Sequence, residues 1–452
     1  MIENLVKSQR EYFKTGKTLD VNTRISYLKK LKAVIKRDEA KIARALYEDL
    51  GKSSTEAYMC ETGMVLEELT RHIKHVKRWA KKKKKSSPLA QFPSKSYRLP
   101  SPYGNVLIIS PWNYPFLLSL QPLIGAVGAG NTVLLKPSRA SASTSAVMKE
   151  IIEEVFPAEY VACVYEGDTL NDEILTYKFD YIFFTGGKTV GKTVYKAASE
   201  NLTPVTLELG GKSPAVIDKT AKIELSAKRV AFGKFLNAGQ TCVAPDYVIA
   251  HKDVAERFVN CLKEQIAKMY PDPLNNKNYG KIISARHFER VKNLIGKNVV
   301  YGGKFDESTQ KIEPTVIFPA SEKDEAMQEE IFGPVLPVLT YSTEEELLEI
   351  INKNPTPLAF YLFTCNKQFE KKILNAVSFG GGCVNDTVIH LASKLPFGGV
   401  GTSGIGNYHG EQSFYTFSHF KSVLKKSNAI DLPMRYSPYK KSNDKLIRFF
   451  MK

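Results

Sequence analysis

The sequence has few of the residues that build metal centres and disulfide frameworks. Its 452 residues include six cysteines and seven histidines, and no two cysteines have C-x-x-C spacing. No histidine cluster lies near a cysteine, so we predict neither a metal site nor a disulfide framework. Unpaired thiols persist in reducing compartments, and we therefore expect a cytoplasmic protein.

Long apolar runs and internal repeats are also lacking. No apolar run approaches the roughly 20 residues that a membrane-spanning helix needs. The first residues, Met1 to Lys7, lack the apolar core of a signal peptide. We expect no transmembrane segment.

Negative charge is scarcer than positive charge. The chain has 64 Lys and Arg residues against 47 Asp and Glu residues, a net charge of +17. Lysines occur in many segments and no nucleic-acid motif accompanies them, so we interpret the charge as a solvated surface rather than a nucleic-acid site. The tail, 437–452, is polar and basic; a weak contact with a membrane surface stays open beside packing on a partner subunit.

Short apolar runs alternating with helical segments fill most of the chain. Residues 2–80 are expected to be helical, and the proline-rich stretch 89–103 is expected to be an extended arm. From Val106 onward, strand-like runs alternate with helices, one of them expected over 169–177, and a second such series follows residue 210. Buried strands that alternate with helices indicate parallel sheets covered on both faces, which bind ligands at the carboxyl ends of their strands.

One cysteine stands in an unusual setting, in the stretch Phe232 to Asp246. The helical pattern breaks at Ala238-Gly239, and Cys242 follows just before an apolar strand. A thiol between small residues at a helix end is accessible and nucleophilic. The alternative is that Cys242 is a small buried filler.

Three further stretches carry polar groups at the ends of predicted strands. Asn113 follows a strand within a turn that two prolines make rigid, a suitable place for an oxyanion donor or for a simple Asx turn. Glu208 ends an apolar strand, where partial burial raises the pKa of a carboxylic acid toward that of a general base. Glu330 and Phe332 flank a turn, where a carboxylate can accept from ribose hydroxyls and an aromatic ring can face a nicotinamide.

A glycine-rich loop follows the strand at Tyr181. Gly186 to Thr193 has the G-x-x-x-x-G-K-T spacing of a phosphate-binding P-loop, for which Asp218 is the tempting magnesium ligand. A glycine turn that leads into a helix can equally hold the pyrophosphate of a dinucleotide.

Taken together, these stretches resemble the aldehyde dehydrogenase superfamily over nearly the whole chain. The quoted motifs stand in the family order: Pro111-Trp-Asn-Tyr114, Lys136-Pro-Ser138, Phe184-Thr-Gly-Gly187, Leu207-Glu-Leu-Gly-Gly-Lys-Ser-Pro214, Gly239-Gln-Thr-Cys242, Glu330-Ile-Phe-Gly-Pro334 and Leu395-Pro-Phe-Gly-Gly-Val-Gly-Thr-Ser-Gly404. Gly406-Asn-Tyr-His-Gly410 and Arg435-Tyr-Ser-Pro-Tyr439 are similar to the shorter dimeric class that includes fatty-aldehyde dehydrogenases. In this family the loop after Phe184 lies by a cofactor pyrophosphate, and Lys192 and Thr193 are ordinary helix residues, so the resemblance argues against the P-loop interpretation.

The resemblance implies an α/β fold of two doubly wound open domains, a Rossmann-like cofactor domain and a catalytic domain, with a small oligomerisation arm. We expect the dinucleotide-binding domain at 1–81 and 100–209 and the catalytic domain at 210–395. The arm is expected at 82–99 and 396–440, before a polar tail at 441–452. A homodimer is the expected assembly.

The resemblance also assigns the site residues. Cys242 would attack an aldehyde, Asn113 would hold the oxyanion, and Glu208 would activate the water that hydrolyses the thioester. The cofactor, NAD or NADP, would be bound by Lys136, Ser138, Arg139, Thr185, Gly186, Gly187, Gly191, Glu208, Leu209, Gly210, Glu330 and Phe332. An apolar substrate pocket, suited to medium- or long-chain aliphatic or aromatic aldehydes, would be lined by Tyr114, Met64, Phe232, Thr241 and Ile389.

One position departs from the class. Arg139 stands where the class commonly has a glutamate that accepts from the ribose 2′-hydroxyl. A cation pairs instead with a 2′-phosphate, so we predict tolerance of, or preference for, NADP. Two other functions stay open: an acylating enzyme that transfers the acyl group to coenzyme A, against which Glu208 argues, and a binding protein without turnover.

Overall fold

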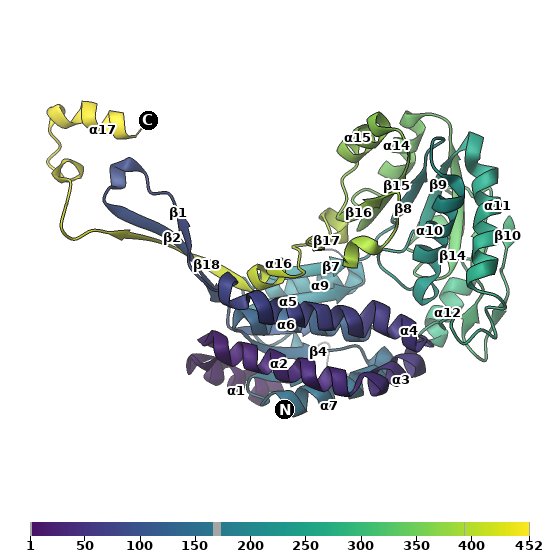
Figure 1. Cartoon of the computed structure of the whole chain (residues 1–452), viewed down its shortest axis with the longest axis horizontal. Coiled ribbons are helices and arrows are strands. Elements are labelled where there is room, and N and C mark those ends of the chain that lie inside the picture. Colours follow the sequence, from purple (N-terminus) through teal and green to yellow (C-terminus); the bar gives the residue numbers. More distant parts are fainter. Residues whose placement is uncertain (1, 166–172, 393, 452) are drawn as a thin grey trace.

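The computed structural model describes residues 2–165, 173–392 and 394–451. Within this part of the chain the strands form a six-stranded, a seven-stranded and a three-stranded sheet, together with a two-stranded ribbon. The two large sheets and their helices form the body, and the three-stranded sheet projects away from it (Figure 1). The predicted α/β fold with two open sheets is confirmed. The helix expected over 169–177 begins outside the described residues.

The six-stranded sheet has the strand order β17-β7-β6-β3-β4-β5. Its parallel strands are β3 (Asn105–Ile109), β4 (Thr132–Lys136), β5 (Val161–Cys163), β6 (Tyr181–Gly186) and β7 (Val205–Leu209). The order reverses between β3 and β6, and a dinucleotide crevice forms at such a switch point in doubly wound folds.

Helix α6 (Pro115–Ala129) fixes the position of the turn that carries Asn113. All fifteen of its residues are buried, because the helix is apolar on every side. It packs between the six-stranded sheet and helices α2 (Val21–Arg37) and α5 (Gly63–Trp79) (Figure 1). The other helices of this unit include α1 (Ile2–Lys14), α3 (Glu39–Leu50), α7 (Ala142–Val155) and α9 (Lys188–Ser199).

The seven-stranded sheet has the order β10-β13-β14-β9-β8-β15-β16. Its parallel strands are β8 (Pro214–Ile217), β9 (Tyr247–His251), β13 (Thr315–Ile317), β14 (Val335–Tyr341), β15 (Ala359–Phe363) and β16 (Gly381–Val384), and β10 (Val299–Tyr301) joins antiparallel to β13. The sheet is covered by α10 (Ile223–Phe235), α11 (Lys252–Met269), α14 (Glu344–Asn352) and α15 (Lys367–Ala376).

The projecting sheet consists of β1 (Lys83–Lys85), β2 (Ser94–Pro102) and β18 (Ser418–Lys426), all antiparallel. The sequence prediction placed 396–440 in an oligomerisation arm. Within that range β17 (Gly404–Ile405) pairs with β7 and covers its edge, and α16 (Glu411–Thr416) packs on α6.

Candidate active site

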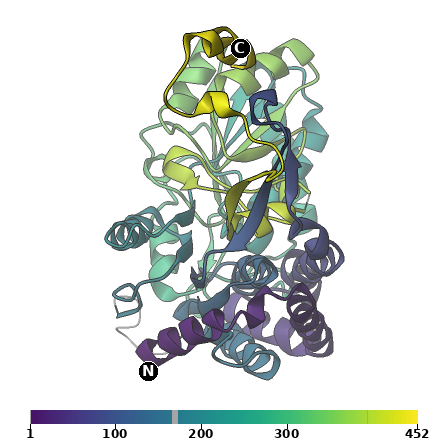
Figure 2. The same ribbon diagram turned by 90° about the vertical axis from the view of Figure 1, so that its left-hand side faces the viewer.

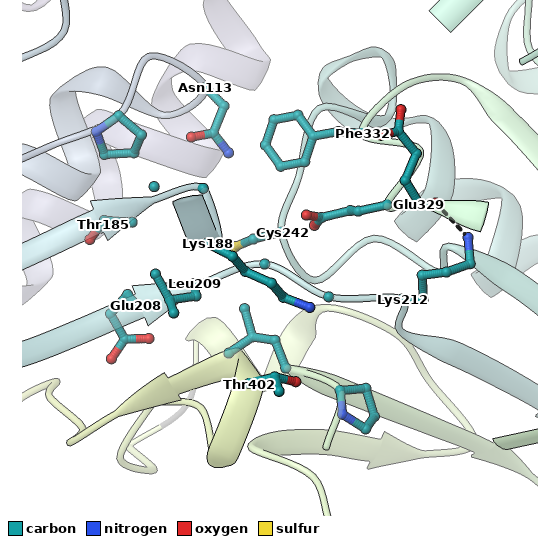
Figure 3. A pocket seen from close by; sticks show the side chains of 18 of the residues that line it. Asn113, Thr185, Lys188, Glu208, Leu209, Lys212, Cys242, Glu329, Phe332 and Thr402 are labelled. Carbon is teal, nitrogen blue, oxygen red and sulfur yellow. Dashed lines mark hydrogen bonds between the residues drawn. The ribbon is translucent and has the colours of Figure 1, made fainter. Parts of the chain in front are cut away.

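A cavity of about 670 Å³ opens at the carboxyl ends of β6 and β7, between the two large sheets. It collects many of the predicted residues from distant parts of the chain (Figure 3). Those that line it are Asn113, Thr185, Gly186, Gly187, Glu208, Leu209, Gly210, Cys242, Glu330 and Phe332. The predicted catalytic residues and most of the predicted cofactor residues therefore share one cavity.

Cys242 follows a backbone of uncommon conformation. After α10 ends, Asn237, Ala238 and Gly239 have φ angles of 52°, 50° and 75°, all in the left-handed region. A Cβ atom on Gly239 would lie 2.2 Å from the carbonyl oxygen of Gly333, so glycine is required there. This compact reversal presents the half-buried thiol of Cys242 to the cavity.

The surroundings of Cys242 keep its proton on sulfur. Burial, followed by the nearby carboxylates of Glu330 and Glu208, raises the pKa of the thiol to about 12. The backbone N–H groups of Cys242 and Val243 oppose this shift but do not overcome it. A cation that enters the cavity is therefore needed to favour the thiolate.

Glu208 is the last residue but one of β7 and is almost completely buried. Neither carboxylate oxygen has a hydrogen-bond partner among the described residues. Burial raises the pKa of Glu208 well above its ordinary value, because the charged form has no compensating donor. In Figure 3 the carboxylate is directed away from Cys242, so the side chain must rotate to reach a group bound at the sulfur.

The amide of Asn113 is held from several sides. Its Nδ2 donates to the carbonyl of Gln240 at 3.1 Å, next to the Cys242 segment. Its own backbone carbonyl accepts from Nζ of Lys52 at 3.0 Å and from Nδ2 of Asn237 at 2.8 Å. The side chain that was predicted to hold an oxyanion is thus fixed to the loop that carries Cys242.

A buried ionic cluster beneath Asn113 was missed by sequence reasoning. Lys52 and Glu61 form an ion pair of 2.5 Å and are both fully buried. Glu61 also accepts from the backbone N–H groups of Phe116 and Leu117, at 2.9 and 3.1 Å, and so caps α6. Nζ of Lys52 lies 3.9 Å from the centre of the Tyr114 ring.

A second carboxylate, Glu56, links the same region to the loop that carries Cys242. It accepts from the backbone N–H of Asn237 at 2.9 Å. The side chain of Gln240 adds three further hydrogen bonds in this region. It donates to the backbone carbonyls of Asn237 and Lys281 and accepts from the backbone N–H of Ile283, each at 3.0 Å. The only sequence signal for this cluster was charge within a helical region, which usually means a solvated face.

The turn with Glu330 and Phe332 is fixed by a buried ion pair. Nζ of Lys212 lies 2.5 Å from Asp246 and also donates to the carbonyls of Ala326 and Glu329. Asp246 accepts from the N–H of Ile331 at 3.0 Å. Burial and the charge of Asp246 raise the pKa of Glu330 to about 8.

The cavity has the features that a dinucleotide requires. Gly186 and Gly187 lead from β6 into α9, whose first residue, Lys188, also lines the cavity, and a helix N-terminus of this kind can hold a pyrophosphate. A Cβ atom on Gly210 would lie 2.1 Å from the Glu330 carboxylate, so this carboxylate closes tightly over the loop after Glu208. The hydroxyl oxygen of Thr185 is buried without a partner among the described residues. These donors and spaces fit the group.

Four predicted cofactor residues lie outside the lining of this cavity. Lys136 is the buried last residue of β4, and burial together with the charge of Arg139 lowers its pKa to about 8. The hydroxyl of Ser138 accepts from the N–H of Ala140 and caps the turn that exposed Arg139 begins. Gly191 lies within α9, where a Cβ atom would come within 2.6 Å of a methyl carbon of Leu209, so that side chain would have to move.

The predicted substrate residues are dispersed. Tyr114 and Thr241 are buried and bonded to each other through their hydroxyls at 2.6 Å. Phe232 packs half-buried on the core, and Ile389 is exposed. Met64 lines a second, small cavity with Glu67, Glu68, Arg71, Gln121, Leu391, Ala392 and His409.

The two cavities are lined by neighbouring residues. Tyr408 lines the larger one and His409, the next residue, lines the smaller one. On α6, Leu118 lines the larger cavity and Gln121 lines the smaller one. Oε1 of Gln121 is buried without a partner among the described residues. Cys242 lines the larger cavity and not the smaller one, whose volume of about 20 Å³ is that of a single water site.

No group of three or more metal-binding side chains occurs among the described residues. None of the described helices has the length and apolar character needed to cross a bilayer.

Comparison with known proteins identifies relatives over the full length. A profile of the Aldehyde dehydrogenase family matches residues 1–423. The chain is 45% identical over 457 residues to a 4,4'-diaponeurosporen-aldehyde dehydrogenase of Staphylococcus aureus, covering 100% of this chain and 99% of the relative. A dimeric, NADP-preferring aldehyde dehydrogenase of Rattus norvegicus is 42% identical, with 94% and 95% covered.

A solved structure agrees with these sequence matches. The substrate-bound state of Staphylococcus aureus AldH superimposes with a TM-score of 0.98 at 44% identity, and both chains are covered completely.

Proposed function

The chain belongs to the aldehyde dehydrogenase family and oxidises aldehydes with NAD or NADP, and from that premise we propose that Cys242 is the nucleophile that carries the acyl group. The supporting observation is that Cys242, Asn113 and Glu208 share one cavity with a dinucleotide cradle. Formation of a covalent acyl intermediate on Cys242, followed by its hydrolysis, replaces one difficult reaction by two easier ones.

In the first step the thiol of Cys242 loses its proton to solvent, the sulfur bonds to the carbonyl carbon, and the carbonyl oxygen becomes an oxyanion. The Nδ2 group of Asn113 and the backbone N–H of Cys242 hold that oxygen. Asn113 needs no reorganisation for this task, because Lys52, Asn237 and Gln240 already fix it.

A bound nicotinamide would supply the acceptor for the hydride of that carbon and a positive charge that favours the thiolate. Cys242 would then hold the acyl group as a thioester. Glu208 takes a proton from water, the water oxygen bonds to the acyl carbon, and the carbon–sulfur bond breaks. The carboxylic acid leaves, and the proton held by Glu208 passes to the sulfur of Cys242, which restores the thiol and the carboxylate.

The dinucleotide is placed by residues on both sheets. We assign Glu330 to the nicotinamide ribose and Phe332 to the nicotinamide ring. The side-chain ring of Phe332 stands edge-on to Trp112, with ring centroids 5.4 Å apart. Thr185, Gly186, Gly187, Leu209 and Gly210 surround the remainder of the cavity. We assign Lys136 and Ser138 to the adenosine ribose.

Cofactor preference is assigned to Arg139. Burial, followed by the nearby charge of Arg139, lowers the pKa of Lys136, so an anion between the two cations would be favourable. The rat relative is named NADP-preferring. Arg139→Glu should lower the ratio of kcat/KM for NADP to kcat/KM for NAD by about tenfold or more. If this ratio is the same in the parent enzyme and the variant, Arg139 does not set cofactor preference.

The substrate is assigned as an apolar aldehyde, either medium- or long-chain aliphatic or aromatic. Tyr114, which is buried beside the loop that carries Cys242 and bonded there to Thr241, supports this class. The Staphylococcus aureus relative is named for 4,4'-diaponeurosporen-aldehyde, which we include among the candidates.

The test is a panel of aldehydes with NAD or NADP, in which the absorbance of the reduced cofactor is followed with and without coenzyme A. Turnover without coenzyme A supports hydrolysis, and turnover that depends on it would replace this proposal by acyl transfer. Cys242→Ser should abolish turnover. Glu208→Gln should give a burst of reduced cofactor and a steady rate lower by about 10²–10⁴-fold. An unchanged steady rate would contradict the role of Glu208.

We also propose a homodimer in a reducing, cytoplasmic setting. The rat relative is named dimeric, and all six cysteines are free thiols. The domains at 1–81 with 100–209 and at 210–395 are proposed as units, and the arm is proposed to bridge subunits.

A further inference from the structure

Glu208 lacks the partner that a buried general base needs. Both oxygens of its carboxyl group are buried without a hydrogen-bond partner among the described residues. Burial raises the pKa of Glu208 well above its ordinary value, which favours the neutral acid. A neutral acid cannot take a proton from water. A hydrogen-bond donor beside the carboxyl group would stabilise the carboxylate and restore its basicity.

The side chain of Glu208 projects from one face of the six-stranded sheet together with two threonine hydroxyls. Thr185 on β6 is its register partner and Thr206 lies two residues earlier on β7, so the three side chains point to the same face. The charge of Glu208 reaches Tyr181, but the hydroxyl of Tyr181 is already bonded to that of Thr206 at 2.6 Å. The hydroxyl of Thr185 is buried without a partner, but its short side chain keeps it close to the sheet.

Tyr408 covers this face of the sheet beside Glu208. Its ring stands edge-on to Phe183, which lies on the same face of β6, with ring centroids 5.0 Å apart. Its backbone N–H and carbonyl are bonded to Phe397 at 2.8 and 2.9 Å, which fixes the chain after β17. Figure 1 and Figure 2 show this yellow-green part of the chain between the units of the two large sheets. Tyr408 is 1% exposed and lines the same cavity as Glu208.

The hydroxyl of Tyr408 is an available donor. It makes no hydrogen bond to any described residue. Burial raises the pKa of Tyr408 well above its ordinary value, and the charges of Glu208, Cys242 and Glu68 add to that rise. The hydroxyl therefore keeps its proton near neutral pH, and it lies within electrostatic range of both the carboxyl group and the thiol.

We propose that Tyr408 is a positioning residue whose hydroxyl donates a hydrogen bond to the carboxylate of Glu208 when that side chain turns toward Cys242. This inference rests on the role proposed above for Glu208. The carboxyl group points away from Cys242 and has to rotate, and Tyr408 is in range of both groups (Figure 3). The hydrogen bond favours the charged form and so lowers the pKa of Glu208 toward the working pH. Tyr408 itself neither gains nor loses a proton.

The experiment measures hydrolysis of the thioester in Tyr408→Phe. Enzyme, NAD and aldehyde are quenched in acid during turnover, and the mass of the intact chain gives the fraction of Cys242 that carries an acyl group. The steady rate divided by this fraction is the rate constant of hydrolysis. Loss of the donor raises the pKa of Glu208, so hydrolysis should be about tenfold slower than in the parent near pH 7 and within about threefold of it near pH 10.

Two further measurements separate positioning from a structural role. The ratio kcat/KM for the aldehyde is set no later than hydride transfer, so it should stay within about threefold of the parent while acyl enzyme accumulates. Tyr341→Phe is the matched control, because it removes the hydroxyl of another buried tyrosine, on β14 and outside the lining of the cavity. It should leave the pH profile of hydrolysis unchanged.

Three results would overturn the proposal. They are parental hydrolysis near pH 7 in Tyr408→Phe, an equal loss at every pH, which would mean that Tyr408 acts by packing, and displacement of the pH profile by Thr185→Val but not by Tyr408→Phe. Glu208→Gln separates this inference from the function on which it rests. Parental hydrolysis in Glu208→Gln would remove both, whereas slow hydrolysis there beside a parental Tyr408→Phe would remove Tyr408 alone.

Discussion

The thiol of Cys242 has a reactivity that depends on what else occupies its cavity. Because its pKa is raised to about 12, the thiolate fraction grows roughly tenfold per pH unit between pH 7 and pH 10. We predict that alkylation of Cys242 by iodoacetamide follows this slope and that NAD or NADP accelerates it by about tenfold or more at pH 7. Peptide mass spectrometry reads the site directly, with exposed Cys365 as the internal control. A plateau below pH 9, or equal rates with and without cofactor, would contradict this view.

Lys52 acts on the chemistry through Asn113 rather than by touching substrate. Lys52→Met should cost about 3–5 kcal/mol of unfolding free energy, because Glu61 is left as a buried charge without a partner. Adding Glu61→Gln removes that charge and should recover most of the stability. It should not restore kcat, because the carbonyl of Asn113 still lacks its cation.

Urea unfolding and steady-state kinetics separate these two effects. Lys29→Met, on the exposed side of α2, is the control and should change stability by less than about 0.5 kcal/mol. Recovery of kcat together with stability in the double variant would show that Lys52 has a structural role alone.

At the scale of elements, the sequence predicted most strands but not how distant elements meet. The strands are recognised because apolar runs such as Val106–Ile109 are bounded by turn residues and alternate with helical periods. The contacts of Glu56 with Asn237, 181 residues apart, and of Lys52 with Asn113, 61 residues apart, follow from the packing of helices on one another. Local patterns contain no such information, which is why this cluster was missed.

We expect the chain reversal between α10 and β9 to be strongly destabilised when a single methyl group is added at Gly239. Gly239→Ala combines a φ of 75° with a contact of 2.2 Å to Gly333, so we predict a loss of about 1–3 kcal/mol or more in unfolding free energy. Turnover should fall further than stability explains, because Cys242 moves with the reversal. Gly296→Ala is the control, since no atom lies within 4 Å of the added carbon. Parental turnover in Gly239→Ala would show that the reversal does not position the thiol.

On the scale of the whole molecule, the arm is too thin to be stable by itself. Three strands projecting from the body bury little apolar surface, and β16 leaves an open edge on the seven-stranded sheet. We therefore predict a native mass of two chains of 50.6 kDa, measured by light scattering at micromolar concentration. A mass of one chain under these conditions would rule out the bridging role of the arm.

The pairing of β17 with β7 has a consequence for the order in which the protein is made. Gly404 lies opposite Glu208, and Phe397, Thr402 and Tyr408 line the same cavity, so the site includes residues close to the end of the chain. Until residue 405 leaves the ribosome, β7 offers a bare edge on which a neighbouring nascent chain can pair. The edge of the strand that carries Glu208 is thus covered late in synthesis. A chain that terminates shortly before residue 404 leaves this edge unpaired, and we expect it to aggregate through strand pairing rather than to form a weaker enzyme.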